Sequence, residues 1–275
     1  MSRVIASLKM TKRSDIHVVI IDALNLIRRI DGALRGYSKT AQLDGQQLID
    51  LTVQALNKLI KGHRPSHIMA VFDGDGDNWR KAFYPEYKAD RKPMADDLKA
   101  LLPTLRERWQ ALGVASIVPA HDEADDIIAT IAHKVSQHKN QCTVISTDSG
   151  FWQLIPQGIN IWDHFAGQWV HHEQVYRKFN VRPQQLLDYW AIVGQSGNKI
   201  PGVSGLGPKA ALTILSEFGD LKTAFSHSDP DNKTLTKLLA AKEQAQISYR
   251  LVLLKQDIAL GINLRDYAYT VPTGN

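Results

Sequence analysis

Four short runs of apolar, often β-branched residues lie in the first part of the chain, at residues 18–21, 68–72, 114–118 and 144–147. Other segments repeat their apolar residues with the 3.6-residue period of an α-helix, at 43–59, 98–112 and 124–135. Buried strands that alternate with amphipathic helices are typical of βαβ units. The pattern predicts an α/β fold with a mostly parallel central sheet and flanking helices.

The pattern changes after about residue 172, where no further strand is indicated. Helices are predicted at 184–193, 208–218 and 233–260, and the glycines between the first two allow a tight hairpin. We therefore expect three parts, which are a basic tail (1–14), an α/β domain (15–180) and a helical domain with a helix-hairpin-helix (181–275).

Composition restricts the class of protein. Hydrophobic residues make up 44% of the 275 residues and charged residues 22%, which favours a globular chain over a disordered one. The single cysteine, Cys142, excludes an internal disulfide framework, and no apolar run has the length of a membrane span. We expect a monomeric cytoplasmic protein without a membrane or a small-molecule cofactor.

The net charge of +5 is unevenly distributed. Residues 1–14 contain four bases and no acid, and Met10 is an alternative start within this tail. An acidic run at 121–128 and a basic run at 79–92 stand out in the rest of the chain. This separation favours a metal site acting on a polyanion, with a mixed solvated surface as the alternative.

Three aspartates directly follow predicted strands, namely Asp22, Asp73 and Asp148. A lone strand-end aspartate commonly caps a helix or forms a turn, but ligands of open α/β sheets bind at this edge. The acidic stretch 122–126 opens the predicted helix 124–135, where the helix dipole favours acids. Because four neighbouring acids repel one another, a divalent cation is indicated, and hard oxygen ligands suit magnesium or manganese.

An EF-hand is excluded at Asp73, and a phosphatase is a weaker alternative. The stretch 73–77 begins like an EF-hand loop, but Asn78 and Tyr84 occupy the positions that require glycine and glutamate. A phosphatase could use Asp73 and Asp75 as nucleophile and partner, although no matching loop or lysine is identified.

Two segments suit nucleic acid. Residues 80–92 interleave bases with aromatic residues, which could bind phosphates and stack on bases, or could form a plain basic loop. Glycines in the stretch 202–210 would let backbone N–H groups approach a phosphate at a helix start. This form is typical of a helix-hairpin-helix that grips a DNA backbone, and a plain turn is the alternative.

Together these segments resemble the flap endonuclease or 5′-nuclease family, and within it the standalone bacterial exonuclease IX type. The resemblance covers roughly residues 15–260. The matching stretches are Ile20-Ile-Asp-Ala-Leu-Asn25, Val71-Phe-Asp73, Tyr84-Pro-Glu-Tyr-Lys-Ala-Asp-Arg91, Glu123-Ala-Asp-Asp126, Ser146-Thr-Asp148 and Ile200-Pro-Gly-Val-Ser-Gly-Leu-Gly207.

The resemblance implies a helical arch, a helix-three-turn-helix DNA clamp and two divalent metals that support phosphodiester hydrolysis at 5′ flaps. The implied first metal cluster is Asp22, Asp73, Glu123 and Asp125, and Asp126 and Asp148 would face the second metal. Arg80 and Lys88 would act on the scissile phosphate, with Arg91 also binding DNA. The clamp would contact DNA through Gly205, Leu206, Gly207, Pro208, Lys209 and Ala210, and would bind potassium through the carbonyls of Ile192, Val193, Pro201, Val203 and Leu206.

The sequence departs from the family at the second metal. Three family carboxylates are replaced by Gly150, Gln195 and Asn198, as is known for the exonuclease IX subgroup. Loss of anionic ligands should weaken the second ion. The resemblance thus implies a magnesium-dependent, structure-specific 5′ nuclease for flapped or branched DNA, and the alternative is a DNA-junction binding protein with a decayed active site.

Overall fold

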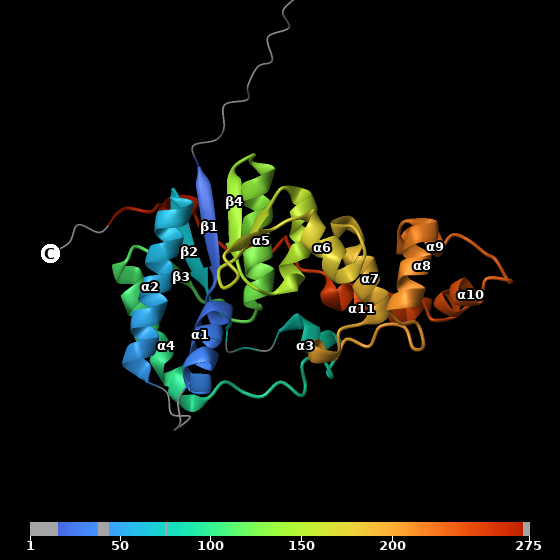
Figure 1. The fold of residues 1–275 in the computed structure, drawn as a ribbon, viewed down its shortest axis with the longest axis horizontal. Helices are drawn as coiled ribbons and strands as arrows, with labels where there is room; N and C mark the ends of the chain where they lie inside the picture. The colour runs from blue at the N-terminus through green and yellow to red at the C-terminus, as the bar shows by residue number, and fades with distance from the viewer. Residues whose placement is uncertain (1–15, 38–43, 75, 77, 272–275) are drawn as a thin grey trace, which may run out of the picture.

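The computed structural model describes residues 16–37, 44–74, 76 and 78–271. The basic tail and Met10 lie outside this range. Six strands form one sheet in the order β3-β2-β1-β4-β5-β6 (Figure 1). All neighbouring strands are parallel except β5 and β6. The strands are β1 (His17–Asp22), β2 (His67–Val71), β3 (Ala115–Ile117), β4 (Gln141–Ile145), β5 (Asn160–Asp163) and β6 (Gln168–Val170).

Both faces of the sheet are covered, which explains why the strands are continuously apolar. Val19 and Ile21 of β1 pack into the layer formed by α1 (Ala23–Tyr37), α2 (Gly45–His63) and α4 (Asp96–Ala111). The alternate residues Val18 and Ile20 pack against α5 (Ala124–Gln137) and the 3₁₀ helix η1 (Ser149–Gln157). The predicted fold class, an α/β fold with a mostly parallel sheet, is confirmed.

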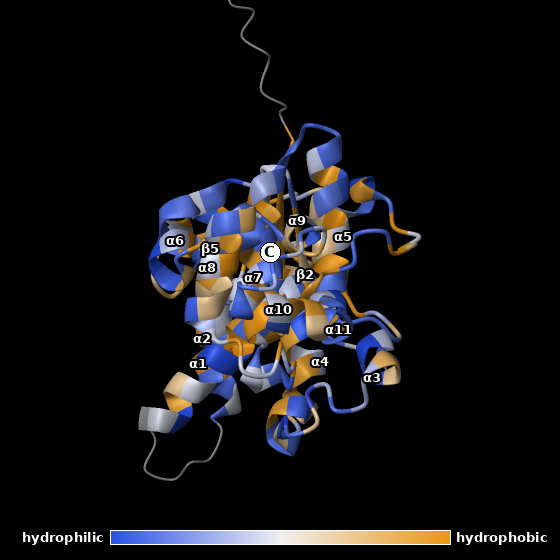
Figure 2. Cartoon of the chain, turned by 90° about the vertical axis from the view of Figure 1, so that its right-hand side faces the viewer, coloured by the Kyte–Doolittle hydropathy of each residue, from blue (hydrophilic) through white to orange (hydrophobic). Residues whose placement is uncertain are grey.

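The helical part has its own apolar core beside the sheet. Surface helices show hydrophilic and hydrophobic residues side by side in Figure 2, as amphipathic helices require. The helices are α6 (His172–Phe179), η2 (Pro183–Gln185), α7 (Leu186–Val193), η3 (Ser196–Asn198), α8 (Pro208–Phe218), α9 (Leu221–Ala224), α10 (Lys233–Ala240) and α11 (Lys242–Val252).

The predicted helix at 233–260 is wrong in its extent. It is two helices, and after Val252 the chain leaves the helical part and returns to the sheet. There η4 (Leu264–Tyr267) forms, and the Tyr269 N–H donates to the Ser66 carbonyl at 2.8 Å. Leu254 is buried against α5 and η1. The chain therefore leaves the helix after Val252 and buries its apolar side chain against the sheet instead.

The segment between β2 and α4 is the one expected to contain the helical arch. Its described residues form one short helix, α3 (Trp79–Phe83), followed by turns and an extended stretch up to α4. In Figure 1 this segment runs along the lower side of the molecule, from below the sheet to the helical part and back. No helix of the described residues is long and apolar enough to cross a membrane.

Candidate metal and DNA site

The strand-end aspartates meet at one edge of the sheet. Asp22 ends β1, and Asp73 and Asp148 follow β2 and β4, the two strands that pair with β1. The Asp22 carboxylate accepts hydrogen bonds from Ser146 Oγ at 2.8 Å and from the Asn25 N–H at 3.2 Å. The pKa of Asp22 is raised to about 7, mainly by burial. These two hydrogen bonds oppose the rise, and the charges of Asp148 and Asp73 contribute to it.

The first turn of α5 brings Glu123 and Asp125 to the same edge. Asp73 caps this helix, because its Oδ1 accepts from the Ala124 N–H at 3.0 Å. Burial raises the pKa of Asp125 well above its ordinary value. The charge of Lys88 opposes that rise, and the charges of Asp22, Asp148 and Glu123 add to it. Five of the predicted carboxylates therefore form one electrostatically coupled group, namely Asp22, Asp73, Glu123, Asp125 and Asp148.

This carboxylate group fits a divalent cation in its donor chemistry. All its donors are hard oxygens, and a cation would offset the desolvation and repulsion that raise the two pKa values. Among the described residues, no three acidic, histidine or cysteine side chains form a ready-made ion site. Magnesium commonly keeps several waters and binds one or two carboxylates together with phosphate oxygens, so a partial ligand set suits it.

The raised pKa of Asp22 leads to a prediction for the metal-free protein. Because the folded-state pKa is about 7 against an ordinary 3.8, the folded state favours the neutral acid and loses stability as the group ionises between these values. Asp22→Asn should therefore gain Tm relative to wild type as the pH rises from about 4 to about 7, with a plateau above. Thermal unfolding in a chelator measures this, and a pH-independent difference would contradict it.

Lys88 is held rigidly against the carboxylates. Its backbone has a left-handed φ of 54°, unusual for a non-glycine residue, and its N–H donates to the Asn198 carbonyl at 3.0 Å. Its Nζ donates to Glu123 Oε1 at 2.6 Å. Burial lowers the pKa of Lys88, but the charges of Glu123, Tyr87 and Asp125 outweigh burial and raise it overall. Lys88 is thus a fixed cation at the edge of the carboxylate group.

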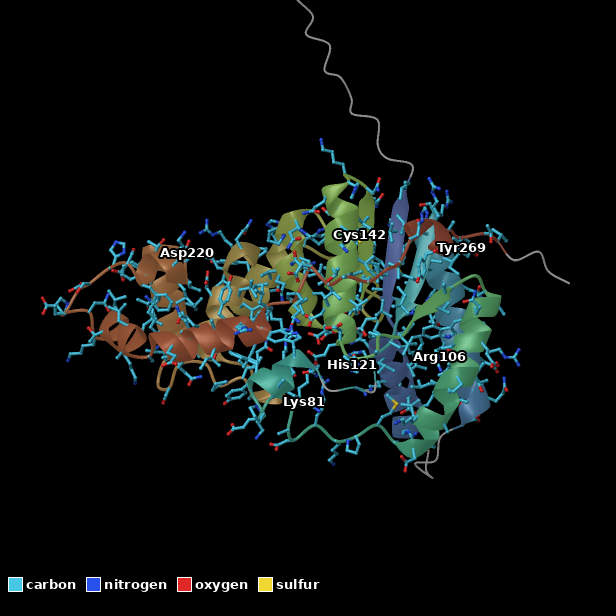
Figure 3. The ribbon with its side chains drawn as sticks, turned by 180° about the vertical axis from the view of Figure 1, so that it is seen from behind. Lys81, Arg106, His121, Cys142, Asp220 and Tyr269 are labelled. Atoms are coloured by element: carbon cyan, nitrogen blue, oxygen red, sulfur yellow. The ribbon has the colours of Figure 1, made fainter. Side chains whose placement is uncertain are left out.

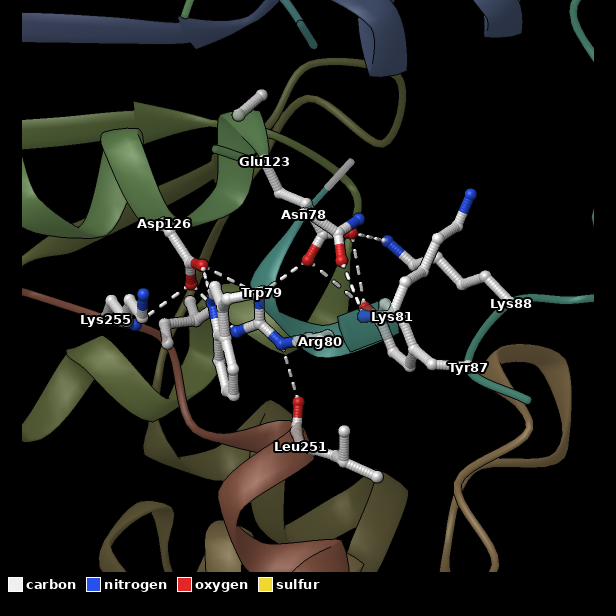
Figure 4. A network of polar contacts seen from close by, with 12 residues as sticks. Asn78, Trp79, Arg80, Lys81, Tyr87, Lys88, Glu123, Asp126, Leu251 and Lys255 are labelled. Carbon is white, nitrogen blue, oxygen red and sulfur yellow. Dashed lines mark hydrogen bonds and ion pairs between the residues drawn. The ribbon is translucent and has the colours of Figure 1, made fainter. Parts of the chain in front are cut away.

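Arg80 and Asp126 are bound to each other in the interior (Figure 4). The exposed fraction is 2% for Arg80 and 0% for Asp126. Both Nη atoms of Arg80 donate to Asp126, at 2.7 and 2.8 Å, and Nη1 also donates to Glu123 at 2.5 Å. Within the described structure, this arrangement buries both residues that were expected to meet the phosphate and the second metal.

A cleft of about 450 Å³ opens beside the carboxylates. Asp73, Lys88 and Glu123 line it, and in Figure 3 the lining residues Lys81 and His121 lie between the α/β and helical parts. Further bases line the same cleft, namely Arg28, Arg91, Lys92 and Lys99. The structure therefore places a basic cleft directly against the acidic site, as a polyanionic substrate requires.

The glycine-rich loop leads into α8 as predicted. Gly207 is the N-cap and Pro208 the first helical residue, while Lys209 is exposed and Leu206 is buried in the helical core. Gly194 and Gly202 have positive φ, and a Cβ on Gly202 would lie 2.6 Å from the Ile192 carbonyl oxygen. This close approach brings the end of α7 to the loop, so the predicted potassium carbonyls share one region. Two of these carbonyls accept hydrogen bonds, Ile192 from the Val203 N–H at 2.7 Å and Val203 from the Leu206 N–H at 3.0 Å.

The three residues that depart from the family pattern make local contacts. Asn198 Nδ2 donates to Gln195 Oε1 at 2.9 Å, so two neutral amides pair where two carboxylates would repel each other. The Gly150 N–H donates to Asp148 Oδ1 at 2.7 Å, and a Cβ on Gly150 would lie 3.2 Å from that oxygen. Asp148 thus caps η1, in the exposed part of the edge.

Further residues support the site. The basic stretch 80–92 offered Tyr87 as an aromatic residue for stacking on bases, but Tyr87 is buried with its hydroxyl 3.4 Å from both Glu123 oxygens. Ser146 and Asn25, for which no role was predicted, support the strand ends. Ser146 and Asn25 lie within the motifs that carried the resemblance, which was the available signal. The contacts of Trp79 and Lys255 with Asp126 join distant parts of the chain and have no local signal.

Comparison with known proteins identifies relatives along the chain. Residues 17–180 match the family described as 5′-3′ exonuclease, N-terminal resolvase-like domain, and residues 181–275 match the 5′-3′ exonuclease, C-terminal SAM fold. The chain is 42% identical over 260 residues to flap endonuclease Xni of Psychromonas ingrahamii, covering 93% of this chain and 98% of the relative. It is 43% identical over 257 residues to the protein of that name from Vibrio vulnificus, covering 93% and 97%.

Solved structures share the fold. A T5 5′-exonuclease with bound zinc ions superposes with a TM-score of 0.72 at 22% identity, covering 86% of this chain and 89% of that chain. The catalytic core of Rad2 in complex with DNA substrate superposes with a TM-score of 0.59 at 14% identity, covering 94% and 83%. The family expected from the sequence motifs is confirmed.

Proposed function

Because the chain belongs to the 5′-3′ exonuclease family, we propose that it is a structure-specific 5′ nuclease that hydrolyses phosphodiester bonds in flapped or branched DNA with magnesium. The observation that carries the proposal is the coupled carboxylate edge lying against a basic cleft. Relatives at 42–43% identity over nearly their whole length are named flap endonucleases, which supports this choice of substrate.

Asp22, Asp73, Glu123 and Asp125 would hold the first ion, and Asp148 would face the second. When bound, divalent ions would activate water and neutralise charge that develops on the phosphate oxygens. Lys88 would add a fixed cation beside the phosphate, because its raised pKa keeps the amine protonated. Arg91, exposed in the same cleft, would hold the DNA backbone.

Cleavage of a labelled 5′-flap duplex over a series of magnesium concentrations tests the proposal. We expect cleavage near the flap junction that rises with magnesium and stops in a chelator. Junction binding without cleavage at any magnesium concentration would favour the alternative, a DNA-junction binding protein. The observation that favours this alternative is the neutral amide pair of Gln195 and Asn198, which stands where the family has carboxylates.

We expect one divalent ion in the free protein and a second only with DNA. Gly150, Gln195 and Asn198 offer no carboxylate, and magnesium requires near-octahedral oxygen coordination. Replacing all three with aspartate should lower the magnesium concentration needed for half-maximal cleavage, because the Gln195–Asn198 pair would become two carboxylates. Calorimetric titration of the DNA-free wild type would refute this if it showed two tight sites.

The clamp would hold the DNA backbone through amides at the start of α8 and through Lys209, with a potassium ion at the nearby carbonyls. Binding should then be indifferent to sequence and sensitive to salt. Lys209→Gln is expected to reduce the slope of log affinity against log salt by about 0.9, the value for one lost phosphate contact. Fluorescence anisotropy across a salt series measures the slope, and an unchanged slope would exclude Lys209 from the interface.

A further inference from the structure

We propose that Arg80 and Asp126 form a buried ionic lock that joins α5 to the end of α11 and holds Glu123, and that neither residue binds metal or phosphate. The proposal deepens the proposed nuclease function. It rests on that function because only there is Glu123 a metal ligand. Both side chains lie in one network of polar contacts that occupies their hydrogen-bonding atoms (Figure 4).

All five N–H groups of Arg80 have acceptors. Nε donates to the Leu251 carbonyl at 2.9 Å, and Nη2 donates to the Leu253 carbonyl and to Asp126, each at 2.8 Å. Nη1 donates to Asp126 at 2.7 Å and to Glu123 at 2.5 Å. With its side chain 2% exposed, Arg80 keeps no donor for a phosphate in the described structure.

Asp126 is equally occupied. A carboxylate offers about four lone-pair positions. Oδ1 accepts from Arg80 Nη2 at 2.8 Å and from the Lys255 N–H at 2.9 Å. Oδ2 accepts from Arg80 Nη1 at 2.7 Å and from Trp79 Nε1 at 2.9 Å. Because every lone pair already has a donor and the side chain is fully buried, a metal would have to displace this network.

The network joins segments far apart in the chain. Carbonyls at the end of a helix lack intrahelical partners and carry negative partial charge, and Arg80 satisfies those of Leu251 and Leu253 at the end of α11. Arg80 also connects that helix end to Glu123 and Asp126 at the start of α5. The lock therefore fixes the helical part to the acidic edge and orients one carboxylate of the site, which makes Arg80 a positioning residue.

The role of Asp126 can be tested against that of its neighbour Asp125 with the same substitution at each position. Asp126→Asn should lower Tm by roughly 10 °C, the effect of breaking one side of a buried pair. It should leave the Mn²⁺ affinity of the DNA-free protein within about twofold, because Arg80 and Lys88 still hold Glu123. Asp125→Asn should do the opposite, keeping Tm and losing at least about tenfold in Mn²⁺ affinity. Equal losses of Mn²⁺ affinity in the two variants would overturn the proposal.

The salt dependence of DNA binding tests whether Arg80 contacts phosphate, and exposed Arg91 serves as the comparison. Arg91→Gln should reduce the slope of log affinity against log salt by about 0.9, and Arg80→Gln should leave it unchanged while lowering kcat more than it raises KM. A slope reduced equally by Arg80→Gln would show a phosphate contact and overturn the proposal.

If the single variants fold poorly, the paired variant Arg80→Met with Asp126→Leu remains informative. Removing both charges leaves no uncompensated buried ion, so the paired variant should lose less Tm than the sum of the single losses. Additive losses would contradict the lock. These Tm measurements need neither metal nor DNA, whereas a wild type that binds neither Mn²⁺ nor flapped DNA would refute the proposed function itself.

Discussion

Replacing Asp125 with alanine is expected to reduce 5′-flap cleavage on the order of 10³-fold or more, because a divalent ion contributes several kcal/mol to phosphoryl chemistry. DNA affinity should stay near the wild-type value, since the clamp and the basic cleft are untouched. Tm should not fall, because Asp125 is a buried carboxylate among other acids and burial disfavours its charge.

Asp73→Ala should abolish cleavage as well, but unlike the Asp125 variant it should also make the protein less stable. Asp73 caps α5 through the Ala124 N–H, so its loss should destabilise the protein by about 1 kcal/mol. Single-turnover cleavage, anisotropy and thermal unfolding on the same samples separate these effects. Asp50→Ala, an exposed acid on α2, is the control. Normal cleavage by either site variant would remove that residue from the metal cluster.

Lys88→Ala should lower the single-turnover cleavage rate by roughly 10²–10³-fold, the usual cost of losing one preorganised donor to a developing negative charge. The loss should be the same at about pH 7 and about pH 9, because the neighbouring acids raise the pKa of Lys88 and keep it charged throughout.

A second lysine provides a close control for this effect. Lys139 also has a left-handed backbone, with φ of 60°, and lies in the turn after α5, away from the site. Lys139→Ala removes the same side chain from the same backbone conformation and should leave cleavage unchanged. A rate for Lys88→Ala near that of Lys139→Ala would mean that the amine does not act on the phosphate.

Much of the fold is determined locally. Residues 18–21 and 68–72 are apolar without interruption because helices cover both faces of the sheet, and the order of amino acids alone displays this pattern. The helix at 208–218 is predicted with its observed ends, because the preceding glycine and Pro208 mark its start chemically. The strands β5 and β6 are not predicted, since four and three residues are too few to show a period.

The acidic edge was also predictable, because Asp22, Asp73 and Asp148 follow strands and parallel strands end at one edge. The partners of Arg80 and Asp126 were decided by the tertiary structure. Arg80 and Asp126 are 46 positions apart in the chain. From the sequence alone they could equally be a phosphate ligand and a metal ligand or the two halves of an ion pair. Only packing shows that α11 closes over them, and once water is excluded each buried charge requires the other.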